Sequence, residues 1–120
     1  MLEIKDITNK LITFRDERDW QQFHNSKDLA LAISIESSEL LELFLWKNAE
    51  EVNVEKLKDE LADVIAYCLL LAEKHKLSIT EIVEAKILKN ELKYPIEKAK
   101  GKSTKYTDLC SFTKVVRLNF

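Results

Sequence analysis

The sequence holds one glycine, Gly101, and one proline, Pro95, among its 120 residues. A phosphate-binding loop of the Walker or Rossmann type needs several glycines that let the backbone approach the phosphates, so both kinds are excluded. An all-β sandwich is excluded as well, because its turns need glycine, proline or similar residues about every ten positions. Long helices remain, and the chain is long enough for one domain with one core.

The sequence also lacks a large excess of charge of either sign, and it lacks long apolar runs. The 19 lysines and arginines nearly balance 21 aspartates and glutamates, so nothing favours non-specific binding of nucleic acid. The longest apolar run, residues 64–72, is too short for a membrane span of about 20 residues, and residues 1–6 lack the apolar core of a signal peptide. Two cysteines, Cys68 and Cys110, are too few for a cysteine-rich zinc site and suit a reducing compartment. We therefore expect a cytoplasmic protein that binds neither nucleic acid nor membranes.

Hydrophobic periodicity predicts four helices and hence an all-α fold, a four-helix bundle. The first three predicted helices cover residues 4–17, 26–46 and 54–75, and Ser78 with Glu81 forms a capping box that opens a fourth, ended by Pro95. The second helix is apolar nearly all round, and such a helix usually has neighbours on more than one side. We expect a homo-oligomer with the second and third helices at its interface.

Four carboxylates lie where a charge is costly. Glu36 and Glu39 are three residues apart and share one face of the second helix, and Glu60 and Asp63 repeat this spacing on the third. Apolar residues flank both pairs, so their like charges should raise their pKa values unless a cation neutralises them. A cluster with oxygen ligands alone suits Mg²⁺, or Mn²⁺, rather than zinc. The alternative is that these acids pair with lysines on a solvated helix face.

The order of the two acidic pairs resembles the signature of the MazG-like superfamily of all-α NTP pyrophosphohydrolases. Twenty residues separate Glu36-Ser-Ser-Glu39 from Glu60-Leu-Ala-Asp63. The stretch Arg18-Asp19-Trp20-Gln21-Gln22-Phe23-His24, the Leu45-Trp46-Lys47 segment, and Lys93-Tyr94-Pro95 with Lys105-Tyr106 look like the dCTP pyrophosphatase branch. The resemblance covers about residues 10–109, so we expect a MazG-like domain over residues 1–109 and a C-terminal tail over residues 110–120.

The resemblance implies that the protein is an enzyme of the nucleotide pool. It would hydrolyse a nucleoside triphosphate between the α and β phosphates, giving a monophosphate and pyrophosphate. The catalytic Mg²⁺ ligands would be Glu36, Glu39, Glu60 and Asp63, with Glu39 as the first candidate for the base that accepts a proton from the attacking water. The assembly would be a homodimer or a homotetramer built as a dimer of dimers.

The same resemblance implies a substrate site. By this resemblance, the residues of the base pocket would be Trp20, Phe23, His24, Trp46, Tyr67 and Asn90. Aromatic faces can stack on a base, and the Asn90 amide can form hydrogen bonds with the edge of a pyrimidine. The positive charges that bind the phosphates would come from Lys86, Lys93, Lys98 and Lys105. Tyr94, next to Lys93, would also belong to the substrate site. The alternatives are a core or interface role for Trp46, a core role for Tyr67 and a surface role for His24. The animal dCTP pyrophosphatases have a histidine where Leu11 stands, so dCTP-like or modified nucleotides, rather than dCTP alone, are the expected substrates.

Two other functions stay open at this stage: a non-catalytic regulatory module that binds a nucleotide, and a structural oligomeric adaptor. The complete set of four acids favours the enzyme, because a chain without catalysis has no need of costly like charges.

Overall fold

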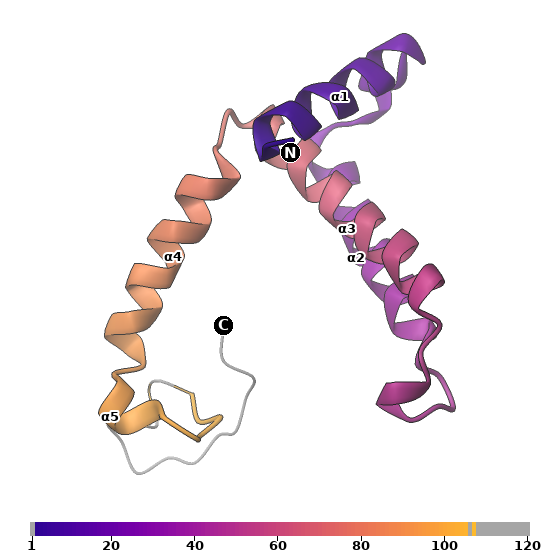
Figure 1. Ribbon diagram of the computed structural model, residues 1–120. Helices are drawn as coiled ribbons and strands as arrows, with labels where there is room; N and C mark the ends of the chain where they lie inside the picture. The colour runs from indigo at the N-terminus through magenta and orange to yellow at the C-terminus, as the bar shows by residue number, and fades with distance from the viewer. Residues whose placement is uncertain (1, 106, 108–120) are drawn as a thin grey trace. The chain divides into compact units, whose positions relative to one another are not determined.

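The computed structural model describes residues 2–105 and residue 107, and every regular element in this part of the chain is helical, as predicted. The chain divides into two compact units, one ending at Ile79 and the other beginning at Thr80 (Figure 1). The first unit contains α1 (Ile4–Glu17), η1 (Trp20–Phe23), α2 (Ser26–Glu42), η2 (Ala49–Glu51) and α3 (Val54–Lys74). The second unit contains α4 (Ile79–Lys93), whose first residue is the last residue of the first unit, and α5 (Ile96–Ala99).

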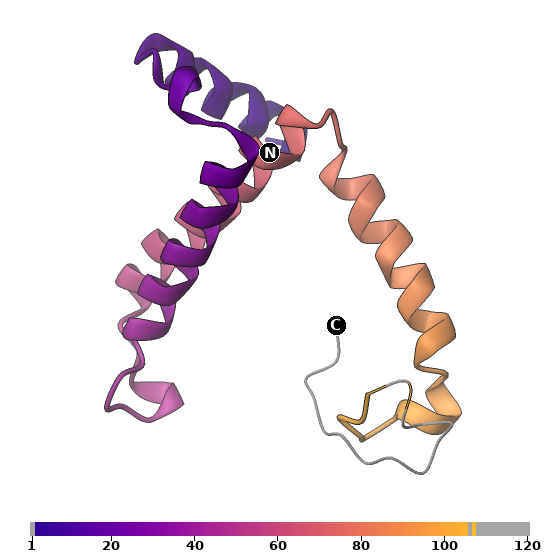
Figure 2. The same ribbon diagram turned by 180° about the vertical axis from the view of Figure 1, so that it is seen from behind.

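Helices α2 and α3 run side by side in opposite directions, and both views show them along most of their length (Figures 1 and 2). Among the described residues, the buried apolar side chains are Leu29 on α2 and Leu69, Leu70 and Ala72 on α3. The core of this unit therefore lies where α2 begins and α3 ends, and α1 also packs against α3. Burial of these apolar side chains is the main force that holds the pair together.

Asparagine side chains fix where α2 and α3 begin. The Asn25 side chain accepts a hydrogen bond from the backbone N–H of Asp28 at 2.9 Å, and Asn53 does the same for Lys56 at 3.1 Å. Each bond satisfies one of the N–H groups that the first helical turn leaves without a partner. The predicted start at residue 26 is thus confirmed with Asn25 as the cap.

The end of α3 is a Schellman motif. The Lys76 N–H donates to the Glu73 carbonyl and the Leu77 N–H donates to the Ala72 carbonyl, both at 2.9 Å. Such a motif places one residue in the left-handed region, and here it is Lys76 with φ 56°. A side chain is strained in that conformation, where glycine is usual.

The predicted length of the second helix is wrong, because α2 ends at Glu42 and not at Trp46. The next N–H groups bond three residues back, with Phe44 donating to Leu41 at 3.0 Å, and Trp46 takes a left-handed φ of 61°. The apolar sequence favoured a longer helix, but Trp46 is 99% exposed and Leu45 is 53% exposed. Two exposed side chains at this point supply little of the tertiary packing that sustains most helices.

In the part of the chain that the structure describes, none of the helices is long and apolar enough to cross a bilayer. Tyr106, Cys110 and the predicted tail over residues 110–120 lie outside the described residues. Cys68 is half-buried, and this burial raises the pKa of its thiol, which keeps the thiol protonated.

Candidate metal and nucleotide site

The antiparallel pairing of α2 and α3 brings the two acidic pairs together. Glu36 lies two helical turns after Leu29, and Asp63 lies two turns before Leu70. The register that buries the two leucines therefore also sets the two carboxylates opposite each other. One carboxylate oxygen from each of Glu36, Glu60 and Asp63 lies within 4.8 Å of the others.

Two atoms of this cluster lack the partners that buried oxygen atoms normally have. Oε2 of Glu36 and Oε2 of Glu60 are buried and accept no hydrogen bond from any described residue. Buried polar atoms are almost always satisfied, and an orphaned one calls for an explanation such as an ion. The alternative, in which these acids pair with lysines, is not what the structure shows for these two atoms.

The electrostatics of the cluster follow from its burial and its like charges. Burial, together with Glu39, Asp63 and Glu60 nearby, raises the pKa of Glu36 from 4.5 to about 7. Glu39 contributes through a side-chain hydrogen bond as well as through its charge. The pKa of Glu60 is also raised, first by burial and then by the charge of Glu39. Without a cation, the cluster therefore holds a proton near neutral pH.

The residues present fit a hard divalent cation. Three carboxylates offer oxygen atoms at one point, and oxygen is the ligand that Mg²⁺ and Mn²⁺ prefer. Glu39 is exposed beside them and interacts with both Glu36 and Glu60. All four predicted acids thus belong to one cluster, in which three have oxygens close enough to share an ion.

Tyr67 lies next to the acids, and His24 lies next to Tyr67. Burial and the negative charges of Glu36, Asp63 and Glu39 raise the pKa of Tyr67, which places its hydroxyl in their field. The His24 ring meets the Tyr67 ring edge-on, with centroids 6.4 Å apart at 71°. Burial, Arg15 and Lys74 lower the pKa of His24, which favours the neutral imidazole, and its Nδ1 is buried without a partner among the described residues.

The sequence analysis missed the cations around His24. A cavity of about 210 Å³ beside this ring is lined in part by Arg15, Lys74 and Lys76. Arg15 also pairs with Glu73 of α3 at 3.7 Å, so α1 and α3 are joined close to the ring. These residues are far apart in sequence, and no local spacing pointed to their meeting.

The other predicted aromatic residues of the first unit are exposed, as pocket residues would be without their ligand. Trp20 is 45% exposed and Phe23 is 61% exposed, both on η1, and Trp46 lies in the connection after α2. The alternative of a core role for Trp46 in this unit is therefore excluded, since its side chain is 99% exposed.

The predicted residues of the second unit lie on and just after α4. Lys86, Asn90 and Lys93 belong to this helix, and Tyr94 follows it directly. The Asn90 side-chain nitrogen is buried with no hydrogen-bond partner among the described residues. An amide in this state can still bind a polar ligand.

Comparison with known proteins agrees with the acidic pattern. The MazG-like family matches residues 31–109, a span that contains all four acids. The chain belongs to the MazG-like family. Its sequence is 36% identical over 114 residues to dCTP pyrophosphatase 1 of Bos taurus, which covers 88% of this chain and 68% of that protein. The human dCTP pyrophosphatase 1 has the same identity, with 88% and 67% covered.

A solved structure supports the same family membership. The crystal structure of a pyrophosphatase from Archaeoglobus fulgidus DSM 4304 is 37% identical to this MazG-like chain and matches it with a TM-score of 0.74. The match covers 79% of this chain and 94% of that one. The predicted resemblance to the MazG-like proteins and to their dCTP pyrophosphatase branch is thus confirmed.

Proposed function

We propose that this protein is a Mg²⁺-dependent pyrophosphohydrolase that cleaves dCTP-like or modified deoxynucleoside triphosphates between the α and β phosphates. The comparisons support a dCTP diphosphatase-like hydrolase. The observation that carries the proposal is the acidic cluster, in which Glu36, Glu60 and Asp63 converge and two buried oxygens have no partner. A cluster of this kind is costly to keep unless it binds a cation.

The carboxylates have separate tasks in this mechanism. Glu36, Glu60 and Asp63 would hold Mg²⁺, or Mn²⁺ in its place, and Glu39 would complete the set. When bound, the ion would neutralise part of the negative charge of the triphosphate and would lower the pKa of water at the site. The exposed carboxylate of Glu39 would accept the proton of the water that attacks the α-phosphorus.

Metal binding and protonation compete in this cluster. The proton that Glu36 holds near neutral pH must leave before its carboxylate can bind a cation. Metal affinity should therefore rise as the pH rises through about 7. This coupling follows from the like charges and burial described above.

The substrate site is proposed from the aromatic and basic residues. The base would stack among Trp20, Phe23, His24, Trp46 and Tyr67, with Asn90 reading its polar edge. Stacking on exposed rings suits a site that is open before the substrate binds. The triphosphate would be met by Lys86 and Lys93, with Tyr94, Lys98 and Lys105 in the same stretch.

A homo-oligomer is part of the proposal. Leu31 and Ile35 on α2 and Leu61 and Ile65 on α3 are about half exposed or more. Apolar side chains exposed in such number usually mark an interface. We propose a dimer or a dimer of dimers, with the four-helix bundle completed in that assembly, a domain over residues 1–109 with a tail beyond it, and a cytoplasmic location.

The test is release of pyrophosphate from a panel of canonical and modified NTPs and dNTPs, with Mg²⁺ and with EDTA. Asp63→Ala should lower turnover about a hundredfold or more while the helical content stays unchanged, because a metal ligand is lost. Asp59→Ala, one turn earlier on α3, is the matched control and should stay close to wild type. Absence of pyrophosphate release by the wild type from every nucleotide would refute the enzyme, and nucleotide binding without release would favour the non-catalytic module.

A further inference from the structure

Trp20 stands on a strained turn. The residue before it, Asp19, has a left-handed φ of 54°, which is unfavourable for a residue with a Cβ. The Gln22 side-chain amide donates to the Asp19 carbonyl at 3.0 Å and to its carboxylate at 3.1 Å. The turn at Asp19, which leads directly into η1 and Trp20, is therefore held by side-chain hydrogen bonds from Gln22.

The Trp20 indole itself contacts one ring of α1. It meets Phe14 edge-on, with centroids 5.8 Å apart and planes at 74°. Both rings are nearly half exposed, Phe14 at 48% and Trp20 at 45%. Neither ring is buried in the core, so a contact between the two rings can restrict the indole.

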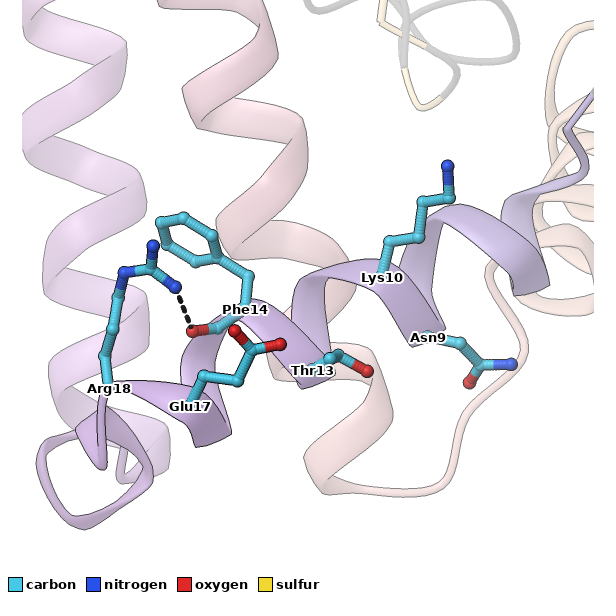
Figure 3. A pocket seen from close by; sticks show the side chains of 6 residues that line it. All are labelled: Asn9, Lys10, Thr13, Phe14, Glu17 and Arg18. Atoms are coloured by element: carbon cyan, nitrogen blue, oxygen red, sulfur yellow. Dashed lines mark hydrogen bonds between the residues drawn. The ribbon is translucent and has the colours of Figure 1, made fainter.

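Arg18 holds Phe14 at two points. Its guanidinium carbon lies 3.7 Å from the centre of the Phe14 ring, and its Nη1 donates to the Phe14 carbonyl oxygen at 2.9 Å. Figure 3 shows the side chain of Arg18 reaching back one helical turn to Phe14. A planar guanidinium can stack on a ring and at the same time donate a hydrogen bond to a carbonyl oxygen. An ammonium group has no planar face and cannot stack on the ring while it donates such a bond.

The surroundings leave this contact open to solvent. Arg18 and Phe14 line a groove of about 370 Å³ along α1, together with Asn9, Lys10, Thr13 and Glu17 (Figure 3). One face of the Phe14 ring is thus covered by a charged group instead of an apolar one. A cation over an exposed ring can restrict it without burying it.

We infer that Arg18 is a positioning residue of the nucleotide site: through Phe14, it fixes the Trp20 indole in the orientation in which the base stacks on it. The inference rests on the proposed function for the part that concerns the nucleotide. It extends the site to Arg18 and Phe14, and neither of these residues is among the predicted site residues.

The first experiment measures the order of the indole directly. The sequence has two tryptophans, so Trp20 is the only one left in a Trp46→Phe background. In that background, Arg18→Gln and Phe14→Leu should lower the fluorescence anisotropy of Trp20 and raise its quenching by acrylamide. Phe14→Tyr keeps the ring and should retain the wild-type signal. Lys10→Gln removes a positive charge from the same groove and is the matched control, which should also retain it.

The second experiment uses chains with Trp46 intact and measures dCTP hydrolysis with Mg²⁺. Arg18→Gln and Phe14→Leu should raise KM about two- to fivefold, the size of an exposed cation–π contact, with kcat within about twofold. A general loss of structure would lower kcat and the helical content instead. Phe14→Tyr should restore KM to the wild-type value.

Each result decides a separate point. A Trp20 signal that both variants leave unchanged would overturn the inference, whatever the kinetics. A looser Trp20 with unchanged KM would overturn the claim that this order serves nucleotide binding. If the wild type releases no pyrophosphate at all, the proposed function fails, and the fluorescence still decides whether Arg18 orders Trp20.

Discussion

Substitution of Glu36 by glutamine should stabilise the metal-free protein above neutral pH. Glu36 has a pKa of about 7 in the folded chain, against 4.5 as its ordinary value. Between these two values the folded state binds more protons than the unfolded state, so the stability of the wild type falls as the pH rises through this window. Glu36→Gln removes the group that takes up the proton, and this part of the pH dependence should disappear.

The size of the effect follows from the two pKa values. The pKa of Glu36 rises from 4.5 to about 7, and each pKa unit corresponds to about 1.4 kcal/mol. The upper limit of the gain in the free energy of unfolding is therefore about 3 kcal/mol. Glu36 is only half-buried, and the neighbouring carboxylates share the repulsion, so part of it remains when Glu36 is neutral. We therefore expect the variant to be about 1–2 kcal/mol more stable than the wild type at about pH 8 in EDTA.

The assay is urea unfolding of both proteins in EDTA at several pH values from about pH 5 to about pH 8. Glu42→Gln, at the end of the same helix, is the control and should keep the wild-type slope of stability against pH. Adding Mg²⁺ at ten times its Kd should stabilise the wild type by about 1.4 kcal/mol and the Glu36→Gln protein by less. The reasoning is refuted if Glu36→Gln has the wild-type slope, or if it is no more stable than the wild type at about pH 8.

Three further substitutions test other parts of the account. Trp46→Ala should raise KM for dCTP about fivefold or more, the loss of one stacking contact, and leave the helical content unchanged; an unchanged KM would exclude Trp46 from the base site. Lys76→Gly should raise the free energy of unfolding by about 1 kcal/mol, because it relieves the left-handed strain after α3, and a lower Tm would contradict this. Leu29→Ala should lower the free energy of unfolding by about 2–5 kcal/mol, measured in urea, since this side chain is only 2% exposed; a change below about 1 kcal/mol would show that the core lies elsewhere.

The acidic cluster could be predicted because it depends on local spacing and on one simple register. A three-residue spacing puts Glu36 with Glu39 and Glu60 with Asp63 on any helix. An antiparallel connection between the two helices then brings the pairs together. The start of α2 could be predicted for the same reason, because the Asn25 cap is a local signal.

The remaining features depend on contacts that no local pattern encodes. The end of α2 at Glu42 follows from the exposure of Leu45 and Trp46, while their apolar character alone favours a longer helix. The contact of Phe14 with Trp20 depends on the left-handed turn at Asp19. Aspartate tolerates this conformation, but the presence of an aspartate does not predict it. Only the four-residue spacing of Phe14 and Arg18 could have pointed to their pairing.

The cations beside His24 are a second case of this kind. Arg15 comes from α1 and Lys74 from the end of α3, and both act on the ring because α1 packs against α3. Their sequence separation hides the pairing, and the lowered pKa of His24 appears only once the helices are placed.

The central claim is tested most directly by identifying the products of dCTP hydrolysis in ¹⁸O-labelled water with Mg²⁺. Attack at the α-phosphorus predicts dCMP that carries the label and unlabelled pyrophosphate, a reaction lost in Asp63→Ala and kept in Asp59→Ala. Formation of dCDP and orthophosphate, or label in the pyrophosphate, would contradict the account.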